Sequence, residues 1–320
     1  MRNVIIQGVR DPSLVRQEYE GYWGSFLDRI RRIVELEPRS LARAMSLCAA
    51  VQAERPARAR WHRGRRVGSL LAGSLLSLQL SEHSRAGISR LVVANMLLES
   101  VGPQTKRIVE LGSGWGANIF HLWLAGAPAS AEYAALEYTA AGREATHLLA
   151  TLEPALRLVT RPFDYNKPDL TEFRSADKTV VFTCYSIEQM THLNGSLFDE
   201  LLAIPGLERV IHIEPVGWQT RPVLWRAAVS AGTYIVPPGI SLAVDVRRAT
   251  RRRRYNVDLV DSLRALERAG RIAIERIEHD FTGVNPLTPG TAIVWHPVRY
   301  SSSKAVSDRP PTTEGNRADA

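Results

Sequence analysis

The residues best suited to chemistry follow short apolar segments of the chain. The stretch IVELGSGWGANIFHLW (108–123) contains a carboxylate, Glu110, and then glycines at alternate positions, Gly112, Gly114 and Gly116. Glycine allows a tight turn and lets a ligand approach the backbone, and the start of a following helix offers N–H groups and a partial positive charge. We therefore expect this turn to hold a small charged cofactor.

Two further acids narrow the type of cofactor. Glu137 ends the segment YAALE, where a carboxylate accepts hydrogen bonds from both hydroxyls of a ribose. In RPFDYN, Asp164 is suitably placed for an exocyclic amine and Phe163 for packing on adenine. The acid at Glu110 would repel the pyrophosphate of a dinucleotide. The pattern therefore favours a ligand with a positive amino group and no phosphates.

Reactive groups are expected at the carboxyl ends of the strands, where ligands of open α/β sheets bind. After the fourth and fifth apolar segments the polar residues are Ser186, Glu188, Gln189, His192 and Glu214. Glu188 is the first choice as general base because it follows its strand almost directly, and His192 is the second. Glu214 could orient an acceptor or pair with a cationic substrate. The alternatives are that Glu188 caps the next helix or pairs with an Arg, and that His192 is a structural or exposed loop residue.

The order of elements predicts an α/β fold. Short apolar runs alternate with helical segments between about residues 105 and 215, which implies parallel strands with right-handed crossovers. The predicted strands are 107–111, 132–137, 156–160, 179–185 and 209–214, followed by a pair at 271–278 and 291–298. His212 lies among isoleucines of the fifth strand and, like His121, is expected to be structural.

Three regions are predicted along the chain. Residues 1–104 form a helical N-terminal cap with no strand after the opening NVIIQGV. Residues 105–300 form the cofactor-binding domain, with an insertion at about 216–254, and residues 301–320 form a polar, disordered tail. Within the cap, YEGYW offers Tyr19, Tyr22 and Trp23 as an aromatic wall, although core packing explains Tyr19 and Tyr22 equally well.

From residue 107 to 298, the glycine motif and the spacing to Glu137 resemble the class I S-adenosylmethionine-dependent methyltransferases. The resemblance implies a seven-stranded, mostly parallel Rossmann-like methyltransferase sheet with an antiparallel last strand. It places the methionine end of the cofactor at Glu110 and the glycines, the ribose at Glu137 and the adenine at Asp164. The full set of predicted cofactor contacts is Glu110, Gly112, Ser113, Gly114, Gly116, Glu137, Asp164 and Ser186.

The predicted activity is methyl transfer from S-adenosylmethionine to a hydroxyl or carboxyl of a small or peptide acceptor, in secondary metabolism. The predicted substrate contacts are Tyr22, Trp23, Gln189 and Asn285. One alternative is an N-methyltransferase for an amine or guanidinium, because two carboxylate loops converge on the methyl. Others are an RNA-modifying enzyme and a cofactor-binding scaffold without turnover.

Charge and composition limit the partners. The net charge of +8 reflects Arg-rich stretches at 55–66 and 247–254, which suit either an anionic partner or a solvated surface. Two cysteines without paired spacing argue against a disulfide frame or a metal site. The longest apolar run, 67–80, is too short to cross a bilayer. We therefore expect a cytoplasmic protein without a membrane segment, which could form a homodimer.

Overall fold

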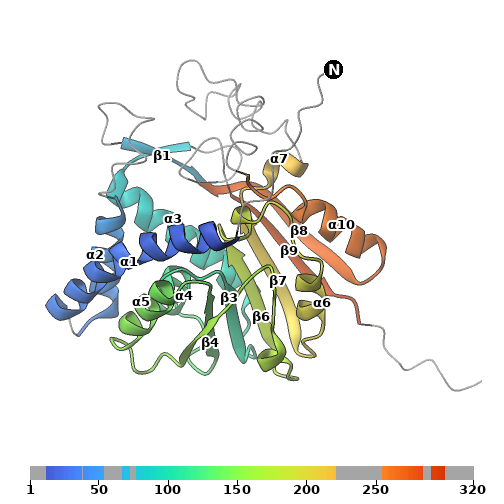
Figure 1. Ribbon diagram of the computed structural model, residues 1–320, viewed down its shortest axis with the longest axis horizontal. Helices are drawn as coiled ribbons and strands as arrows, with labels where there is room; N and C mark the ends of the chain where they lie inside the picture. The colour runs from blue at the N-terminus through green and yellow to red at the C-terminus, as the bar shows by residue number, and fades with distance from the viewer. Residues whose placement is uncertain are drawn as a thin grey trace, which may run out of the picture.

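The chain folds around one twisted β-sheet. The computed structural model describes residues 12–37, 39–53, 67–72, 77–220, 254–283 and 290–299 (Figure 1). Within them the sheet has nine strands in the order β2-β1-β8-β9-β7-β6-β3-β4-β5. The strands are β1 (Val67–Ala72), β2 (Ser77–Ser81), β3 (Arg107–Leu111), β4 (Glu132–Glu137), β5 (Leu158–Pro162), β6 (Thr179–Cys184), β7 (Leu207–Glu214), β8 (Ile272–Gly283) and β9 (Gly290–Pro297).

The pairing confirms the predicted fold class. Strands β3 to β7 pair in parallel, whereas β9 runs antiparallel to both β7 and β8. The seven strands from β3 to β9 therefore form the expected mostly parallel sheet with an antiparallel last strand. Their bounds agree with the predicted segments to within two residues, except at the turn end of β8.

Helices cover both faces of the sheet. They are α1 (Pro12–Leu36), α2 (Leu41–Ala53), α3 (Glu82–Ser100), α4 (Ala117–Leu124), α5 (Ala140–Ala150), α6 (Ser196–Leu202), α7 (Gly217–Thr220) and α10 (Leu259–Arg268). Successive residues of β3 point to opposite sides: Ile108 packs with the cluster of α1 to α5, and Val109 with that of α6 and α10. This two-sided burial explains the continuous apolar runs of the parallel strands.

The N-terminal region differs from the prediction in one respect. Helices α1, α2 and α3 are present as expected, but β1 and β2 form a hairpin that extends the sheet (Figure 1). The prediction of no strand in this region after residue 9 was therefore wrong. Strand β1 pairs with the outer end of β8 through residues 71 and 72. A run mixing leucine with glycine and serine gives a weak local signal, and the neighbouring edge strand supplies the pairing.

Several predictions concern residues outside the described ranges. They are the opening strand, most of the insertion at 216–254, the tail at 301–320, the substrate contact Asn285 and the Arg-rich stretches apart from Arg254. Helix α10 is described and ends just before a left-handed Gly270 with φ +68°. Among the described helices, none combines the length and apolar character needed to span a membrane.

Candidate active site

The glycine turn between β3 and α4 requires glycine for two reasons. Gly112, Gly114 and Gly116 have φ values of +71°, +58° and +77°, in the left-handed region that other residues rarely adopt. A Cβ at Gly112 would lie 2.4 Å from the Cβ of Ser186. A Cβ at Gly114 would lie 2.8 Å from the ring of Trp23. The turn is thus packed against elements from two distant parts of the sequence.

Glu110 lies beneath this turn rather than in an open cavity. It is completely buried, and its Oε1 accepts a hydrogen bond of 2.6 Å from Asn118 Nδ2. Asn118 Oδ1 in turn accepts a hydrogen bond from Arg90 of α3. The other oxygen, Oε2, has no hydrogen-bond partner among the described residues. Burial raises the pKa of Glu110 to about 8, against the opposing effects of Asn118 and Arg90.

This raised pKa predicts a pH-dependent stability. The folded state favours the protonated carboxyl, so the contribution of Glu110 to stability is complete below its ordinary pKa of 4.5 and is lost as pH rises towards 8. The variant Glu110→Gln keeps an acceptor for Asn118 and does not titrate. Relative to it, the wild type should lose up to roughly 1.4 kcal/mol of unfolding free energy per pH unit in this window. Urea denaturation at pH 5, 6.5 and 8 measures this, and parallel curves would contradict the prediction.

Glu137 connects the glycine turn to the cavity beside it. Its Oε2 accepts a hydrogen bond of 2.8 Å from the Gly114 N–H, and its Oε1 accepts bonds from the N–H and hydroxyl of Thr139 at 2.9 and 2.7 Å. The Thr139 hydroxyl also caps α5. Gly112, Gly114 and Glu137 all line the cavity. Three hydrogen bonds from the chain therefore fix the position of a carboxylate that belongs to the cavity wall.

The loop after β5 forms the adjoining wall. Asp164 Oδ1 accepts hydrogen bonds from Asn166 N–H and Nδ2 at 2.8 and 2.9 Å. Phe163 and Tyr165 pack edge to face with ring centroids 4.9 Å apart. All four residues line the cavity, so the predicted Asp164 and Glu137 are brought to one space. Tyr138, Tyr165 and Asn166 were not predicted; each lies within two residues of a predicted one.

Ser186 lies where the turn after β6 meets the glycine turn. Its hydroxyl donates to the Leu111 carbonyl at 2.9 Å and is 2.8 Å from the Tyr165 hydroxyl. The preceding residue, Tyr185, has φ +53°, an unusual conformation for a side-chain-bearing residue. Ser186 and Tyr185 both line the cavity.

The carboxylate of Glu214 holds the turn after β6 in place. It is completely buried at the end of β7, and its carboxylate accepts bonds of 3.2 Å each from the N–H groups of Ser186, Ile187 and Glu188. Burial raises the pKa of Glu214 to about 7. Glu214 is not part of the described cavity lining, so the structure gives it a role in positioning the turn.

His192 is the candidate base that reaches the cavity. It lines the cavity together with Gln189, Met190 and Thr191, whereas Glu188 is not among the described lining residues. The carboxylate of Glu188 accepts a hydrogen bond of 2.7 Å from Gln189 Nε2. His192 Nδ1 lies 3.1 Å from Asp258 Oδ2, and the imidazole is about half exposed.

Asp258 is the functional partner that the sequence did not reveal. It stands at the N-cap of α10, and its carboxylate also accepts bonds from Leu193 N–H at 3.1 Å and Asn256 Nδ2 at 2.9 Å. The buried amide of Asn256 donates in addition to the Met190 carbonyl at 3.0 Å. These contacts fix the loop that carries His192. An acid before a helix signals only a cap in the sequence, so its pairing with His192, 66 residues away, has no local signal.

Helix α1 contributes a further part of the cavity wall. Val15, Tyr19 and Trp23 recur every four residues and line the cavity. Tyr22 instead packs edge to face on Trp23 at 4.6 Å and is 37% exposed. Glu20 of the same helix accepts bonds from the N–H groups of Ala140 and Ala141 at 3.0 and 2.8 Å, which attaches α1 to the start of α5. Of the predicted aromatic wall, Tyr19 and Trp23 reach the cavity.

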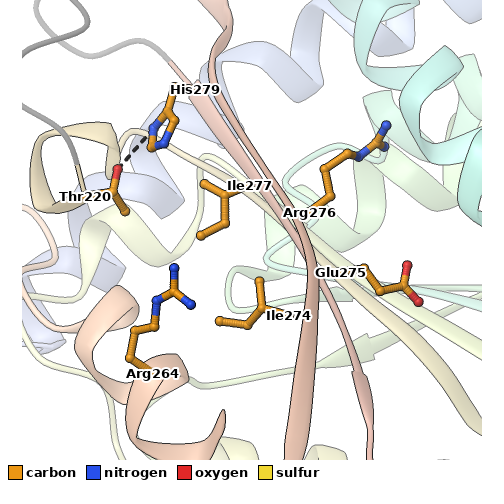
Figure 2. A pocket seen from close by; sticks show the side chains of 7 residues that line it. All are labelled: Thr220, Arg264, Ile274, Glu275, Arg276, Ile277 and His279. Carbon is orange, nitrogen blue, oxygen red and sulfur yellow. Dashed lines mark hydrogen bonds between the residues drawn. The ribbon is translucent and has the colours of Figure 1, made fainter. Parts of the chain in front are cut away.

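Other ionisable groups lie apart from this cavity. His212 is buried, lies 3.1 Å from the Thr183 hydroxyl, and has its pKa lowered to about 3 by burial, which agrees with a structural role. A second hollow lies between α7, α10 and β8 (Figure 2). Its polar side chains bond to protein partners: Thr220 to His279 at 3.0 Å and Arg264 to Glu267 at 2.6 Å.

Comparison with known proteins gives distant structural likenesses only. No family model matches the sequence, and no curated protein matches it. Among solved structures, the chain is similar to a SAM-dependent methyltransferase from Aquifex aeolicus, with 13% identity, 66% of this chain and 93% of that chain covered, and a TM-score of 0.40. It is also similar to magnesium protoporphyrin IX methyltransferase from Synechocystis with bound SAH, with 12% identity, coverages of 67% and 86%, and a TM-score of 0.42. A third is mitomycin 7-O-methyltransferase, with 13% identity, coverages of 68% and 57%, and a TM-score of 0.41. With identities of 12–13% and TM-scores of 0.40–0.42, these likenesses are too distant to indicate a function.

Proposed function

We propose that the chain is an S-adenosylmethionine-dependent methyltransferase that acts on a hydroxyl group of a small molecule, with His192 as general base. One observation carries the proposal: a single cavity is lined both by Gly112, Gly114, Glu137 and Asp164 and by His192, which pairs with Asp258. The arrangement combines a nucleoside site with a proton acceptor.

The residues fit S-adenosylmethionine in charge and shape. Glu137 is suited to a ribose hydroxyl, because a carboxylate has about four acceptor sites and the chain occupies three of them. Asp164 lies next to Phe163, whose ring is suited to adenine. Among the described lining residues there is no Lys or Arg, which suits an adenosyl ligand without phosphates better than a dinucleotide. The buried hydroxyl of Ser113, which has no hydrogen-bond partner among the described residues, lies between two lining glycines.

The bound cofactor would supply a methyl group activated on a sulfonium, so the protein has to position the acceptor and receive its proton. Asp258 accepts a hydrogen bond from Nδ1–H of His192, which leaves Nε2 as the basic nitrogen. Glu214 and Asn256 position the loop between Ser186 and Leu193 through hydrogen bonds to its backbone. His192 is therefore a better candidate for the base than Glu188, the first choice from the sequence.

Further parts of the function stay predictions. The acceptor type, its place in secondary metabolism, the cytoplasmic location and a homodimer rest on the sequence arguments given above. The RNA-modifying alternative depends on Arg-rich stretches that lie almost entirely outside the described residues. The N-methyl alternative depended on Glu188 and Glu214, which are not among the described lining residues.

Removing the Glu137 carboxylate tests the cofactor site. In Glu137→Ala we expect the affinity for S-adenosylhomocysteine to fall by about tenfold to a hundredfold, because charged hydrogen bonds to the ribose are lost. Isothermal titration calorimetry measures this. The matched control is Glu132→Ala at the other end of β4, where the carboxylate pairs with Arg107 at 2.9 Å. Equal affinities for the two variants, or no heat with the wild type, would refute the proposed cofactor.

A further inference from the structure

Three side chains of α1 define the acceptor side of the cavity. Val15, Tyr19 and Trp23 lie at intervals of four residues, so they share one helix face, and all three line the cavity. The loop after β6 adds Tyr185 and Met190 to the lining. Apolar and aromatic surfaces of this kind favour a flat ring, which stacks on aromatic faces or lies edge-on against them.

This wall is held at a fixed position by polar contacts outside the cavity. Glu20 accepts two N–H bonds from the start of α5, and Arg31 pairs with Glu144 of α5 at 2.6 Å. The Trp23 ring packs closely against Gly114. The helix is thereby fixed relative to the cofactor side, so the acceptor ring meets a preformed surface.

The charge of the lining excludes one kind of acceptor. The acids Glu137 and Asp164 line the cavity, and no Lys or Arg is found among its described lining residues. Arg16 lies over the ring of Tyr138 at 5.3 Å and is exposed. A carboxylate acceptor would lose its hydration here without gaining a Lys or Arg partner from the described lining. The cavity therefore favours an acceptor that is uncharged at its ring.

We infer that the acceptor is an uncharged aromatic hydroxyl compound whose ring lies against the Val15, Tyr19 and Trp23 face of α1. The inference rests on the proposed function. It narrows the hydroxyl acceptor of that function to one class, a phenol. The hydroxyl becomes a methyl ether, its proton passes to the imidazole of His192, and the cofactor leaves as S-adenosylhomocysteine.

Three two-ring probes of similar size test the inference by calorimetry on protein saturated with S-adenosylhomocysteine. They are naphthol, naphthoate and decahydronaphthol, which differ in charge and aromaticity. Naphthol should bind at least tenfold more tightly than either of the others. Binding of naphthoate or decahydronaphthol that is as tight, or no binding of naphthol, would overturn the inference.

A pair of α1 variants tests where the ring binds. Tyr19→Leu should weaken naphthol binding about tenfold, whereas Leu14→Ala, at an exposed position of the same helix and outside the described lining, should leave it unchanged. Both should keep the wild-type affinity for S-adenosylhomocysteine, which also verifies folding. Equal losses of naphthol binding in both variants would overturn this inference but not the proposed function. Failure of the wild type to bind S-adenosylhomocysteine would refute the proposed function.

Discussion

Replacing His192 with alanine is expected to lower kcat for methyl transfer by about two to four orders of magnitude. The imidazole is the proposed proton acceptor; it lines the cavity, and its Nδ1 lies 3.1 Å from Asp258 Oδ2. Affinity for S-adenosylhomocysteine should change by less than about twofold, because Glu137 and the glycine turn are untouched. Single-turnover transfer of a labelled methyl group measures the first quantity and calorimetry the second.

The control for this variant is His147→Ala, at an exposed position in the last turn of α5. It should keep full activity. The kcat of Asp258→Asn should lie between those of His192→Ala and His147→Ala, because an amide can direct its NH2 group at Nδ1 of His192 and so stabilise the wrong tautomer. If Glu188→Ala lowers kcat more than His192→Ala does, the assignment of the base is wrong.

A methyl group added at Gly112 is expected to abolish cofactor binding, with a loss of at least a hundredfold in affinity for S-adenosylhomocysteine. The Gly112→Ala variant combines a residue with φ +71° and a Cβ placed 2.4 Å from the Cβ of Ser186. Left-handed strain alone costs about 1–2 kcal/mol. The contact adds to this cost and moves the glycine turn away from the turn after β6. Calorimetry and thermal denaturation measure the two effects.

The chain contains a matched control for the strain. Gly126 has φ +96°, and no heavy atom lies within 4 Å of the position its Cβ would occupy. Gly126→Ala should therefore show the conformational cost without the steric one: a lower melting temperature with unchanged affinity for S-adenosylhomocysteine. Near-normal binding by Gly112→Ala, or an equal loss in Gly126→Ala, would contradict the proposed role of the close packing.

Local patterns predicted much of the fold. The strands from β3 to β7 are apolar runs bounded by turn residues, and the three glycines mark a turn that only glycine can form. These signals lie within a few residues of one another. The β1–β2 hairpin was missed because its pairing with β8 depends on a strand that lies about 200 residues further along the chain.

The candidate site was predicted only in part, because some of its residues have a local signal and others depend on distant contacts. Glu137 and Asp164 end strands or follow them, so the topology alone brings them to one edge of the sheet. The choice between Glu188 and His192 depended on how the turn after β6 is held. That turn is shaped by Glu214 from β7 and by Asn256 and Asp258 before α10. Contacts of this range leave no spacing that could be recognised in the sequence.

The attachment of α1 to α5 has a thermodynamic consequence for the whole site. Glu20 accepts hydrogen bonds from the N–H groups of Ala140 and Ala141 in the first turn of α5, and Trp23 packs against the glycine turn at Gly114. The helix proposed to contact the acceptor is therefore also attached to the proposed nucleoside site. Linkage requires that any coupling between two binding sites act equally in both directions. The acceptor and the cofactor should therefore change each other's affinity by the same factor.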